Sequence, residues 1–480
     1  MIEKKSTLGK RDVSDIQAKA AELIGRLERL PFSRWHLNLA ILASIGVLFD
    51  AADFALFGAA LPPIAKEFRL GPAQAGLLAT LGLVGAFVGA LFWGTISDYI
   101  GRRRSFEGTI AIFTAFTALT AASWSLLSLG LFRFVSNFGL GGQIPVALTI
   151  TSEFMPGRLR GRVSSSVLAA FPLGLALAAG LSLVLIPRFG WRILFAVGIA
   201  PVVMLFFVRR FMPESVRFLI SRGRIAEAEQ TVETIERAAL PAGQRVAATA
   251  RSNIPTEVAI AQGVTVLELV APGRRRTTLL LWVVSFCFFW SSNGILFMLP
   301  TILTQRGIPL SQAISFALVQ GIFGVIGYST CGFLIDRFGR RPVLFLYFFL
   351  GAGFHLWFAM SSGVWMYVAI AFVGWVNPGV YGPTGVYVGE LHPTHLRATA
   401  VGWFFGIGRI GSFLAPAVIG FMLASGMGQY VLYTFALTYL IASFAVIAIG
   451  IETKGMVLEQ ITGVDGPSGV VSAVPSAVKA

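Results

Sequence analysis

Long apolar runs separated by short charged stretches dominate the hydrophobic pattern of this chain. Each run approaches the roughly 20 mostly apolar residues that an α-helix needs to cross a bilayer, and none alternates like a barrel strand. The runs centre near residues 49, 85, 115, 140, 175, 200, 289, 323, 351, 375, 411 and 440. The pattern therefore predicts an all-α polytopic membrane protein with twelve transmembrane helices.

Three charged motifs between these runs occur twice. They are GTISDYIGRR at 94–103 and GFLIDRFGRR at 332–341, EFMPGRLR at 153–160 and ELHPTHLR at 390–397, and PES at 213–215 with a weaker echo, IET, at 451–453. The second copy follows after 237 or 238 residues (390 minus 153, and 336 minus 98). A shared offset across unlinked motifs indicates an internal duplication, so we expect two pseudo-symmetric six-helix bundles.

The duplication and a long hydrophilic stretch between its copies set the expected domain limits. These are a cytoplasmic N-terminal tail at 1–35, an N-terminal six-helix bundle at 36–210, a cytoplasmic linker at 211–276, a C-terminal six-helix bundle at 277–450 and a cytoplasmic C-terminal tail at 451–480. In the linker, Ile225, Ala228, Val232 and Ile235 keep a helical period and predict a short surface helix. The leucines of the first tail fit either an amphipathic helix on the membrane or a partly ordered segment.

Composition supports a membrane protein. Mean hydropathy is +0.76 and only 13% of the residues are charged, against about 25% in soluble domains. The net charge of +15 does not indicate nucleic acid, because Lys and Arg cluster in short loops, where they set topology. Their bias predicts cytoplasmic termini. We expect a monomeric multi-pass protein of a bacterial-type inner membrane, in contact with the lipid bilayer and without a cleavable signal peptide.

No residues in the sequence form a pattern typical of an enzyme. Cys287 and Cys331 fall inside apolar runs, where burial as small hydrophobic side chains is expected. Gly139, Gly141 and Gly142 also lie in an apolar run and lack the strand and the full spacing of a dinucleotide-binding loop. We therefore expect no catalytic residue, no cofactor and no metal.

The doubled loop motif resembles the signature of the major facilitator superfamily of secondary transporters. Its copies at 94–103 and 332–341 match the loops after the second and the eighth helix of that superfamily, and RFVSNFGLGGQIP at 133–145 is similar to the fourth-helix motif. Asn137 stands where a glycine is usual in that motif. The resemblance covers nearly the whole membrane region and implies transport by alternating access.

Charged residues at helix ends form the predicted cytoplasmic gate. A carboxylate where a helix meets the cytoplasm can pair with nearby arginines or with the positive end of a neighbouring helix, and so latch that side until the bundles rock apart. The gate residues are Asp98, Arg102, Arg103, Glu153, Arg160, Asp336, Arg340, Arg341, Glu390 and Arg397. The alternative is that these charges only set topology.

Two acids and one arginine inside the apolar runs are the predicted proton-coupling residues. An ionisable group at the bilayer centre costs about 2.5 to 3.5 kcal/mol on insertion scales, so each such residue is expected to have a functional or structural role. Asp50 and Asp53 share one face of the first helix, and two close carboxylates suit the uptake and release of a proton. Arg133 is the natural counter-charge. The resemblance to proton-coupled sugar porters implies that Asp53 carries the proton under the control of Arg133, and a static ion pair is the alternative.

Polar and aromatic residues in the second half are the predicted substrate contacts. Arg409 lies mid-span and keeps its charge, so it needs either an acid or an anionic ligand. Asn377, Tyr381 and Thr384 form one polar stripe on the tenth helix, which we expect to face a central cavity. The further predicted contacts are Asn293, Trp290, Phe297 and Trp403.

Two local patterns narrow the predicted substrate class. DAAD at 50–53 resembles the paired-aspartate motif of aromatic-acid and organic-acid/proton symporters, whereas sugar porters usually carry only the second acid. FWSSNG at 289–294 stands where sugar porters place a glutamine pair that holds hydroxyls. We predict a proton-coupled symporter of a small organic anion, an aromatic or heteroaromatic monocarboxylate. PES at 213–215 and ETKG at 452–455 keep a sugar or polyol symporter open, and an exporter or a transporter-like receptor remains a further alternative.

Overall fold

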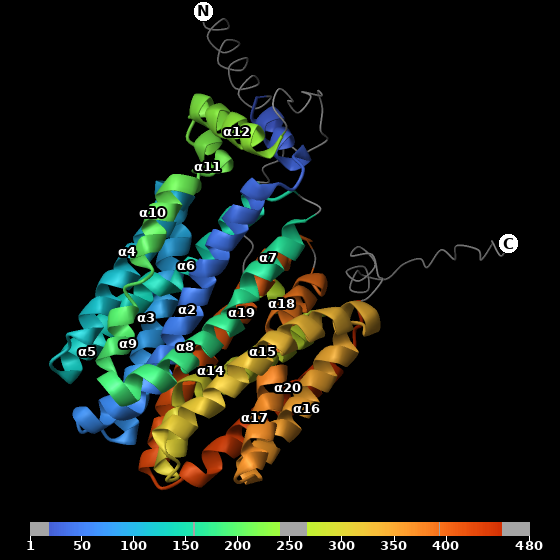
Figure 1. The fold of residues 1–480 in the computed structure, drawn as a ribbon. Coiled ribbons are helices and arrows are strands. Elements are labelled where there is room, and N and C mark those ends of the chain that lie inside the picture. The colour runs from blue at the N-terminus through green and yellow to red at the C-terminus, as the bar shows by residue number, and fades with distance from the viewer. Residues whose placement is uncertain (1–18, 157–158, 241–265, 393, 454–480) are drawn as a thin grey trace, which may run out of the picture.

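The computed structural model describes residues 19–156, 159–240, 266–392 and 394–453. Within these ranges the ordered elements are helices, most of them long and roughly aligned (Figure 1). Ten helical stretches are long and apolar enough to cross a bilayer. Helix α4 and the pair α5–α6 complete a set of twelve among the described residues, although polar residues such as Glu107, Arg133 and Gln143 lower their hydropathy.

The first half of the chain supplies six spans, three of which consist of two consecutive helices. The spans are α2 (Arg34–Glu67), α3 (Pro72–Ile100), α4 (Arg102–Ala121), α5 (Leu126–Gly141) with α6 (Gln143–Phe154), α7 (Arg160–Leu168) with α8 (Ala170–Phe189), and α9 (Arg192–Val197) with α10 (Val202–Phe211).

The second half supplies six more spans. They are α14 (Arg275–Gln305), α15 (Leu310–Phe338), α16 (Arg340–Met360), α17 (Val364–Gly379) with α18 (Tyr381–Glu390), α19 (Thr394–Ala424), and α20 (Val431–Ile449), which follows the short 3-10 helix η1 (Gly428–Tyr430). The predicted twelve-helix architecture is confirmed.

The duplication extends to the places where the helices break. Helix α5 ends at Gly141, four residues before Pro145, and α17 ends at Gly379, four residues before Pro383. A proline cannot donate to the carbonyl four residues earlier, so each proline interrupts the helix at that glycine. Both the glycine and the proline recur 238 residues later (379 minus 141, and 383 minus 145). The fourth and the tenth span are therefore broken at equivalent points.

The doubled loops also share one backbone conformation. Gly101 connects α3 to α4 and Gly339 connects α15 to α16, and both have φ of +101°. This left-handed region strongly favours glycine, which explains why both copies of the motif carry it. We call the end of the molecule with these two loops the motif end, and the opposite end the far end.

Contacts between the two halves lie at the far end and at mid-depth. A Cβ on Gly58 of α2 would lie 2.6 Å from the Leu296 carbonyl oxygen of α14, and one on Gly76 of α3 would lie 2.2 Å from that of Pro416 of α19. Thr80 donates a 2.7 Å hydrogen bond to the Phe413 carbonyl. No hydrogen bond or ion pair at the motif end joins the halves within the described ranges.

Short helices cover the motif end of the first half. They are α11 (Val216–Ser221) and α12 (Ile225–Ala239), with α13 (Val266–Leu269) leading into α14. Figure 1 shows α11 and α12 above α10 and α2. The predicted linker helix is thus present as α12, and Ala228, Val232 and Ile235 are its buried face.

The N-terminal segment forms a helix over residues 19–29 that docks on α12 rather than presenting its leucines to lipid. Leu23 and Leu27 are buried with the apolar face of α12. Arg26 donates to both carboxylate oxygens of Glu236, with its Nε at 2.9 Å. Lys19 pairs with Glu229 at 2.8 Å. Of the two interpretations left open by the sequence, the amphipathic helix is correct, but its partner is protein.

Candidate functional site

A buried ion pair joins the first and the fourth span. The guanidinium of Arg133 on α5 donates to both carboxylate oxygens of Asp53 on α2, at 2.9 and 2.7 Å. Both side chains are at most 2% exposed, and the guanidinium carbon lies 4.5 Å from the centre of the Phe57 ring. The two predicted proton-coupling residues are therefore in direct contact, with the bidentate geometry that makes such pairs strong.

Asp50 is the unpaired member of the acidic motif. It lies one turn before Asp53 on α2 and is 3% exposed. Within the described residues it has no hydrogen bond and no ion pair, but its charge interacts with those of Asp53 and Arg409. Asp50 is thus the point at which the acids of the first half meet the arginine of the second.

Arg409 is a partly buried cation without a partner of opposite charge in contact. Two glycines beside it let α19 approach α14 closely, because a Cβ on Gly408 would lie 2.2 Å from the Phe289 ring and one on Gly411 would lie 2.6 Å from the Phe286 carbonyl oxygen. Arg409 forms no hydrogen bond or ion pair with a described residue, and only its longer-range interactions with Asp50 and Tyr381 are present. A guanidinium held near mid-depth in this way is suited to an anion.

Asn293 on α14 has a fixed amide orientation. Its Nδ2 donates to the Phe289 carbonyl at 3.2 Å and to the Ser412 Oγ at 3.0 Å. Ser412 in turn donates to the Gly408 carbonyl at 3.2 Å. Carbonyl oxygens only accept hydrogen bonds, so the two carbonyl groups fix the direction of every hydrogen bond in this series. The Oδ1 of Asn293 is left as an acceptor. Ser412 lies one turn beyond Arg409, so this acceptor belongs to the same part of the site.

The predicted polar stripe of the tenth span divides between two helices. Asn377 on α17 accepts hydrogen bonds from Ser292 and, at 2.7 Å, from Tyr439. Thr384 on α18 donates to the Val380 carbonyl of its own helix, so its proton is already used. Tyr381 begins α18 and interacts electrostatically with Arg409 and Asp50. Of the three residues, Tyr381 is therefore the one linked to the charged centre.

Aromatic side chains surround Tyr381. Its ring centre lies 5.8 Å from that of Phe289 and 5.5 Å from that of Phe405. Trp290 stacks on Phe286 at 6.0 Å, and its buried indole N–H has no hydrogen-bond partner in the structure. These rings come from α14, α18 and α19, the helices that carry Arg409 and Asn293.

Two further predicted contacts lie elsewhere. Phe297 is 2% exposed and packs against Phe54 and Phe57, where the halves meet towards the far end. Trp403 is 39% exposed and its ring centre lies 5.8 Å from that of Trp282. The structure does not bring these two side chains into contact with the polar residues described above.

The gate motifs form one charged cluster in each half. In the first half, Arg102 contacts Asp98 at 2.6 Å and Glu153 at 3.5 Å. In the second half, Arg340 contacts Asp336 at 3.9 Å and Glu390 at 3.1 Å. Arg397 donates to the Gly389 carbonyl at 2.9 Å, Arg103 donates to Glu107 at 3.1 Å, and Arg341 donates to the Ile447 carbonyl at 3.0 Å. The Arg160 side chain lies outside the described residues.

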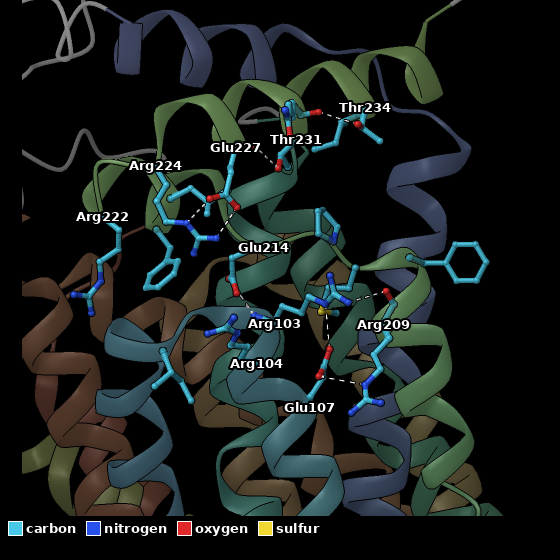
Figure 2. A pocket seen from close by; sticks show the side chains of 18 of the residues that line it. Arg103, Arg104, Glu107, Arg209, Glu214, Arg222, Arg224, Glu227, Thr231 and Thr234 are labelled. Carbon is cyan, nitrogen blue, oxygen red and sulfur yellow. Dashed lines mark hydrogen bonds and ion pairs between the residues drawn. The ribbon is translucent and has the colours of Figure 1, made fainter.

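Two glutamates that the sequence marked only as motif residues complete these clusters. Glu214 accepts from the backbone N–H groups of Arg102 at 2.7 Å and Arg103 at 3.2 Å (Figure 2). Glu452 accepts in the same way from Arg340 and Arg341, each at 2.9 Å. Each glutamate therefore caps the helix that follows its half's signature loop, where free N–H groups favour an anion. The separation of 238 residues between them (452 minus 214), which the repeated loop motif shares, is the sequence signal that the two glutamates have equivalent roles.

Within the residues that the structure describes, no group of three or more His, Cys, Asp or Glu side chains is arranged to hold a metal ion. The charged groups at mid-depth are few and belong to helices of both halves. Their arrangement provides an arginine without an acidic partner in contact, an unpaired carboxyl group and a fixed acceptor.

Comparison with known proteins finds transporters that match over most of the chain. The niacin transporter NiaP of Acinetobacter baylyi is 33% identical over 443 residues, which cover 92% of this chain and 99% of that protein. The 4-hydroxybenzoate transporter PcaK of the same organism is 32% identical, over 89% of this chain and 93% of that protein. The E. coli xylose transporter XylE, in a partially occluded inward-open conformation, has the same fold, with a TM-score of 0.69 at 17% identity over 88% of this chain and 100% of that one.

The family model described as "Sugar (and other) transporter" matches residues 40–464. This range begins inside α2, includes the other eleven spans in full and contains both copies of the loop motif. The transporter family inferred from the doubled motifs is thereby confirmed, and the chain belongs to the sugar (and other) transporter family, with the fold of a major facilitator superfamily xylose symporter.

Proposed function

We propose that this protein is a symporter that moves a small aromatic monocarboxylate together with a proton. The observation that carries the proposal is the guanidinium of Arg409, which lies near mid-depth without a carboxylate in contact. The relatives are named for niacin, benzoate, 4-hydroxybenzoate and gallate, each an aromatic ring with one carboxylate. The carboxylate that these compounds share therefore matches the positive charge of Arg409.

The substrate carboxylate binds Arg409 in this proposal. A planar guanidinium offers two parallel N–H donors to a carboxylate, and a site shielded from water strengthens the pair. The unpartnered indole N–H of Trp290 lies on the neighbouring helix α14 as an additional donor. The ring of the substrate would then lie against Tyr381 and the phenylalanines beside it, where offset or edge-on ring contacts are favourable.

Asn293 gives the site a preference among ring substituents. Both amide hydrogens of Asn293 are held by Phe289 and Ser412, so the side chain offers a ligand only its Oδ1, which is a hydrogen-bond acceptor. A ring hydroxyl or a ring N–H can donate to this oxygen, whereas an unsubstituted ring leaves it without a partner. A buried polar group without a partner costs roughly 1–3 kcal/mol. We therefore expect hydroxybenzoates to be preferred over benzoate.

In this proposal, proton coupling depends on Asp50. Arg133 is committed to Asp53, and among the described residues the cation whose charge acts on Asp50 is Arg409. A substrate carboxylate on Arg409 would neutralise that cation and bring a second negative charge near Asp50. A buried carboxylate without a counter-charge is costly, so substrate binding favours the protonated form of Asp50. The anion and the proton thus bind together, while Asp53 stays paired with Arg133.

The arginine-rich motif end faces the cytoplasm in this proposal, because positively charged loops stay on that side. The halves touch at the far end, and no hydrogen bond or ion pair between described residues joins them at the motif end, so we infer an inward-facing state. The protein would act as a monomer in a bacterial inner membrane, with both chain ends on the cytoplasmic side.

Uptake by proteoliposomes with an imposed pH gradient tests the proposal. The substrates are nicotinate, benzoate, 4-hydroxybenzoate and xylose. We expect the gradient to drive accumulation of the three acids but not of xylose. Replacement of Arg409 by Ala should cost about 2–5 kcal/mol of substrate binding, at least thirtyfold in KM. Arg306→Ala, at the exposed end of α14, is the matched control. Xylose uptake that survives Arg409→Ala would instead establish a sugar carrier.

Two further variants separate coupling from binding. Asp50→Asn, which imitates the neutral acid, should keep substrate exchange but lose accumulation against a gradient. Equal loss of both activities would assign Asp50 a structural role. Asn293→Leu should abolish the preference for 4-hydroxybenzoate over benzoate while leaving benzoate uptake nearly unchanged. An unchanged preference would show that the Oδ1 of Asn293 does not contact the ring substituent.

A further inference from the structure

A cavity of about 1020 Å³ lies at the motif end of the first half, away from the mid-depth site (Figure 2). Its walls come from α3, α4, α10, α11 and α12, with Trp35 of α2 at one side. All of its lining residues belong to the first half. Neither the proposed transport cycle nor the gate requires a space of this size at this place.

The cavity carries excess positive charge. Its lining contains six arginines and three glutamates, namely Arg103, Arg104, Arg209, Arg210, Arg222, Arg224, Glu107, Glu214 and Glu227. The carboxylates are all engaged by protein groups. Glu214 accepts from backbone N–H groups of α4, Glu107 pairs with Arg103 at 3.1 Å and with Arg209 at 3.5 Å, and Glu227 forms a two-point pair with Arg224.

Three of the arginines have no acidic partner among the described residues. One of them, Arg222, donates to the Tyr99 carbonyl at 2.7 Å, which leaves two. Arg104 at the start of α4 and Arg210 at the end of α10 are exposed, and neither has a carboxylate within ion-pair distance among the described residues. Arg210 contacts only the face of the neighbouring Phe211 ring, at 5.8 Å. The cavity therefore presents two uncommitted guanidinium groups to whatever enters it.

The rim of the cavity lies at the ends of two candidate membrane spans. Tyr99 and Ile100 are the last residues of the span formed by α3, Phe211 is the last residue of the span that ends with α10, and all three line the cavity. Tyr99 is 65% exposed and Phe211 is 51% exposed. Exposed aromatic rings at span ends are typical of the depth of lipid headgroups. Phe207, one turn deeper on α10, stacks on Phe211 at 6.1 Å and extends this apolar surface.

We propose that this cavity binds the phosphate headgroup of an anionic phospholipid. Arg104 and Arg210 contact the phosphate oxygens, and the acyl chains lie along the exposed aromatic residues of α10. Arginine suits this role because its planar fork matches phosphate oxygens in pairs. The apolar rim favours a lipid over a soluble phosphate, because a soluble ion gains nothing from contact with Tyr99 and Phe211. A bound lipid would bridge α4, α10 and α12 within one half.

Thermal unfolding of the full-length protein in detergent, with short-chain phosphatidylglycerol added, tests this assignment. A ligand that binds only the folded state raises the unfolding temperature in a saturable way. We expect such a rise with phosphatidylglycerol and none with phosphatidylcholine of the same chain length. The double variant Arg104→Gln with Arg210→Gln should weaken the apparent affinity roughly thirtyfold, since each arginine near the headgroup contributes roughly fivefold.

Two controls keep the outcomes distinct. Arg275→Gln with Arg276→Gln removes the same charge at the exposed start of α14 and should leave the affinity unchanged. Arg104→Lys with Arg210→Lys should restore most of the binding, which a variant that merely misfolds would not show. Equal affinity of the glutamine double variant and the unmodified protein would overturn the proposal. Glycerol phosphate that reproduces the full rise would show that the ligand is a soluble phosphate and not a lipid.

Discussion

Replacement of Gly76 by Ala should open the far end of the molecule. Gly76 lies near the start of α3, and a Cβ there would be 2.2 Å from the Pro416 carbonyl oxygen and 3.1 Å from the Gly420 Cα. Both obstacles are backbone atoms of α19, which cannot rotate away. Ordinary contact begins near 3.4 Å, so the two helices must separate by about 1.2 Å. Such overpacking typically costs about 1–3 kcal/mol.

That energy acts on one conformation only, because the contact exists only while the far ends of the halves touch. At about 1.4 kcal/mol per tenfold change, the ratio of far-end-closed to far-end-open molecules should fall by about 5- to 150-fold. Gly94→Ala is the matched control on the same helix, since a Cβ there meets nothing within 4 Å. Both substitutions change intrinsic helix preference equally, so their difference isolates the contact.

The assay is labelling of a cysteine at position 80 by a membrane-impermeant maleimide added on the far side. Thr80 lies one turn from Gly76, and its hydroxyl donates to the Phe413 carbonyl in the seam between the halves. The native Cys287 and Cys331 are at most 5% exposed and give a low background. Labelling should be faster with Gly76→Ala than with Gly94→Ala. Equal rates in the two variants would refute the view that this helix contact holds the far end closed.

Three further predictions concern the motif end. Glu214→Gln should lower the free energy of unfolding by about 1–3 kcal/mol, because a charged cap on two backbone N–H groups becomes neutral. Comparing its unfolding temperature with that of the equivalent Glu452→Gln variant would show whether both caps contribute to stability. Arg26→Ala should cost about 3–5 kcal/mol because it leaves Glu236 buried without its partner, and a loss no larger than that of an exposed arginine would contradict this. Burial lowers the pKa of His392 below that of an exposed histidine, so as the pH falls the unfolded chain binds a proton before the folded protein does. The contribution of His392 to stability is therefore fully present above about pH 6.5 and is lost as the pH drops below that value. The variant His392→Gln should show a smaller decrease in unfolding temperature over this pH range.

The sequence predicts most of the fold because hydrophobic length and repetition are local properties. Twelve apolar runs become twelve spans, and the offset between the charged motifs reappears in the two left-handed glycines, Gly101 and Gly339. The contact between Asp53 and Arg133 was also predictable, because two buried ionisable groups of opposite charge have few other partners.

Other features depend on tertiary detail that no sequence period carries. The pair of Arg26 and Glu236 joins residues 210 positions apart, outside the duplicated segments. The orientation of Asn293 depends on a backbone carbonyl of its own helix and on the Ser412 hydroxyl of another. Thr384 looked like part of a polar stripe, yet its hydroxyl is satisfied within its own helix. Helical spacing identifies which residues share a face, but not which polar atoms remain free.

The far-end seam is made mainly of backbone brought close by glycines, whereas every motif-end ion pair described above lies inside one half. Salt screens exposed charges but has little effect on contacts between packed backbones. Raising the ionic strength should therefore loosen the charged cluster within each half and leave the closure of the far end almost unchanged. Ionic strength should thus change the charged clusters at the motif end without changing the contact that holds the two halves together.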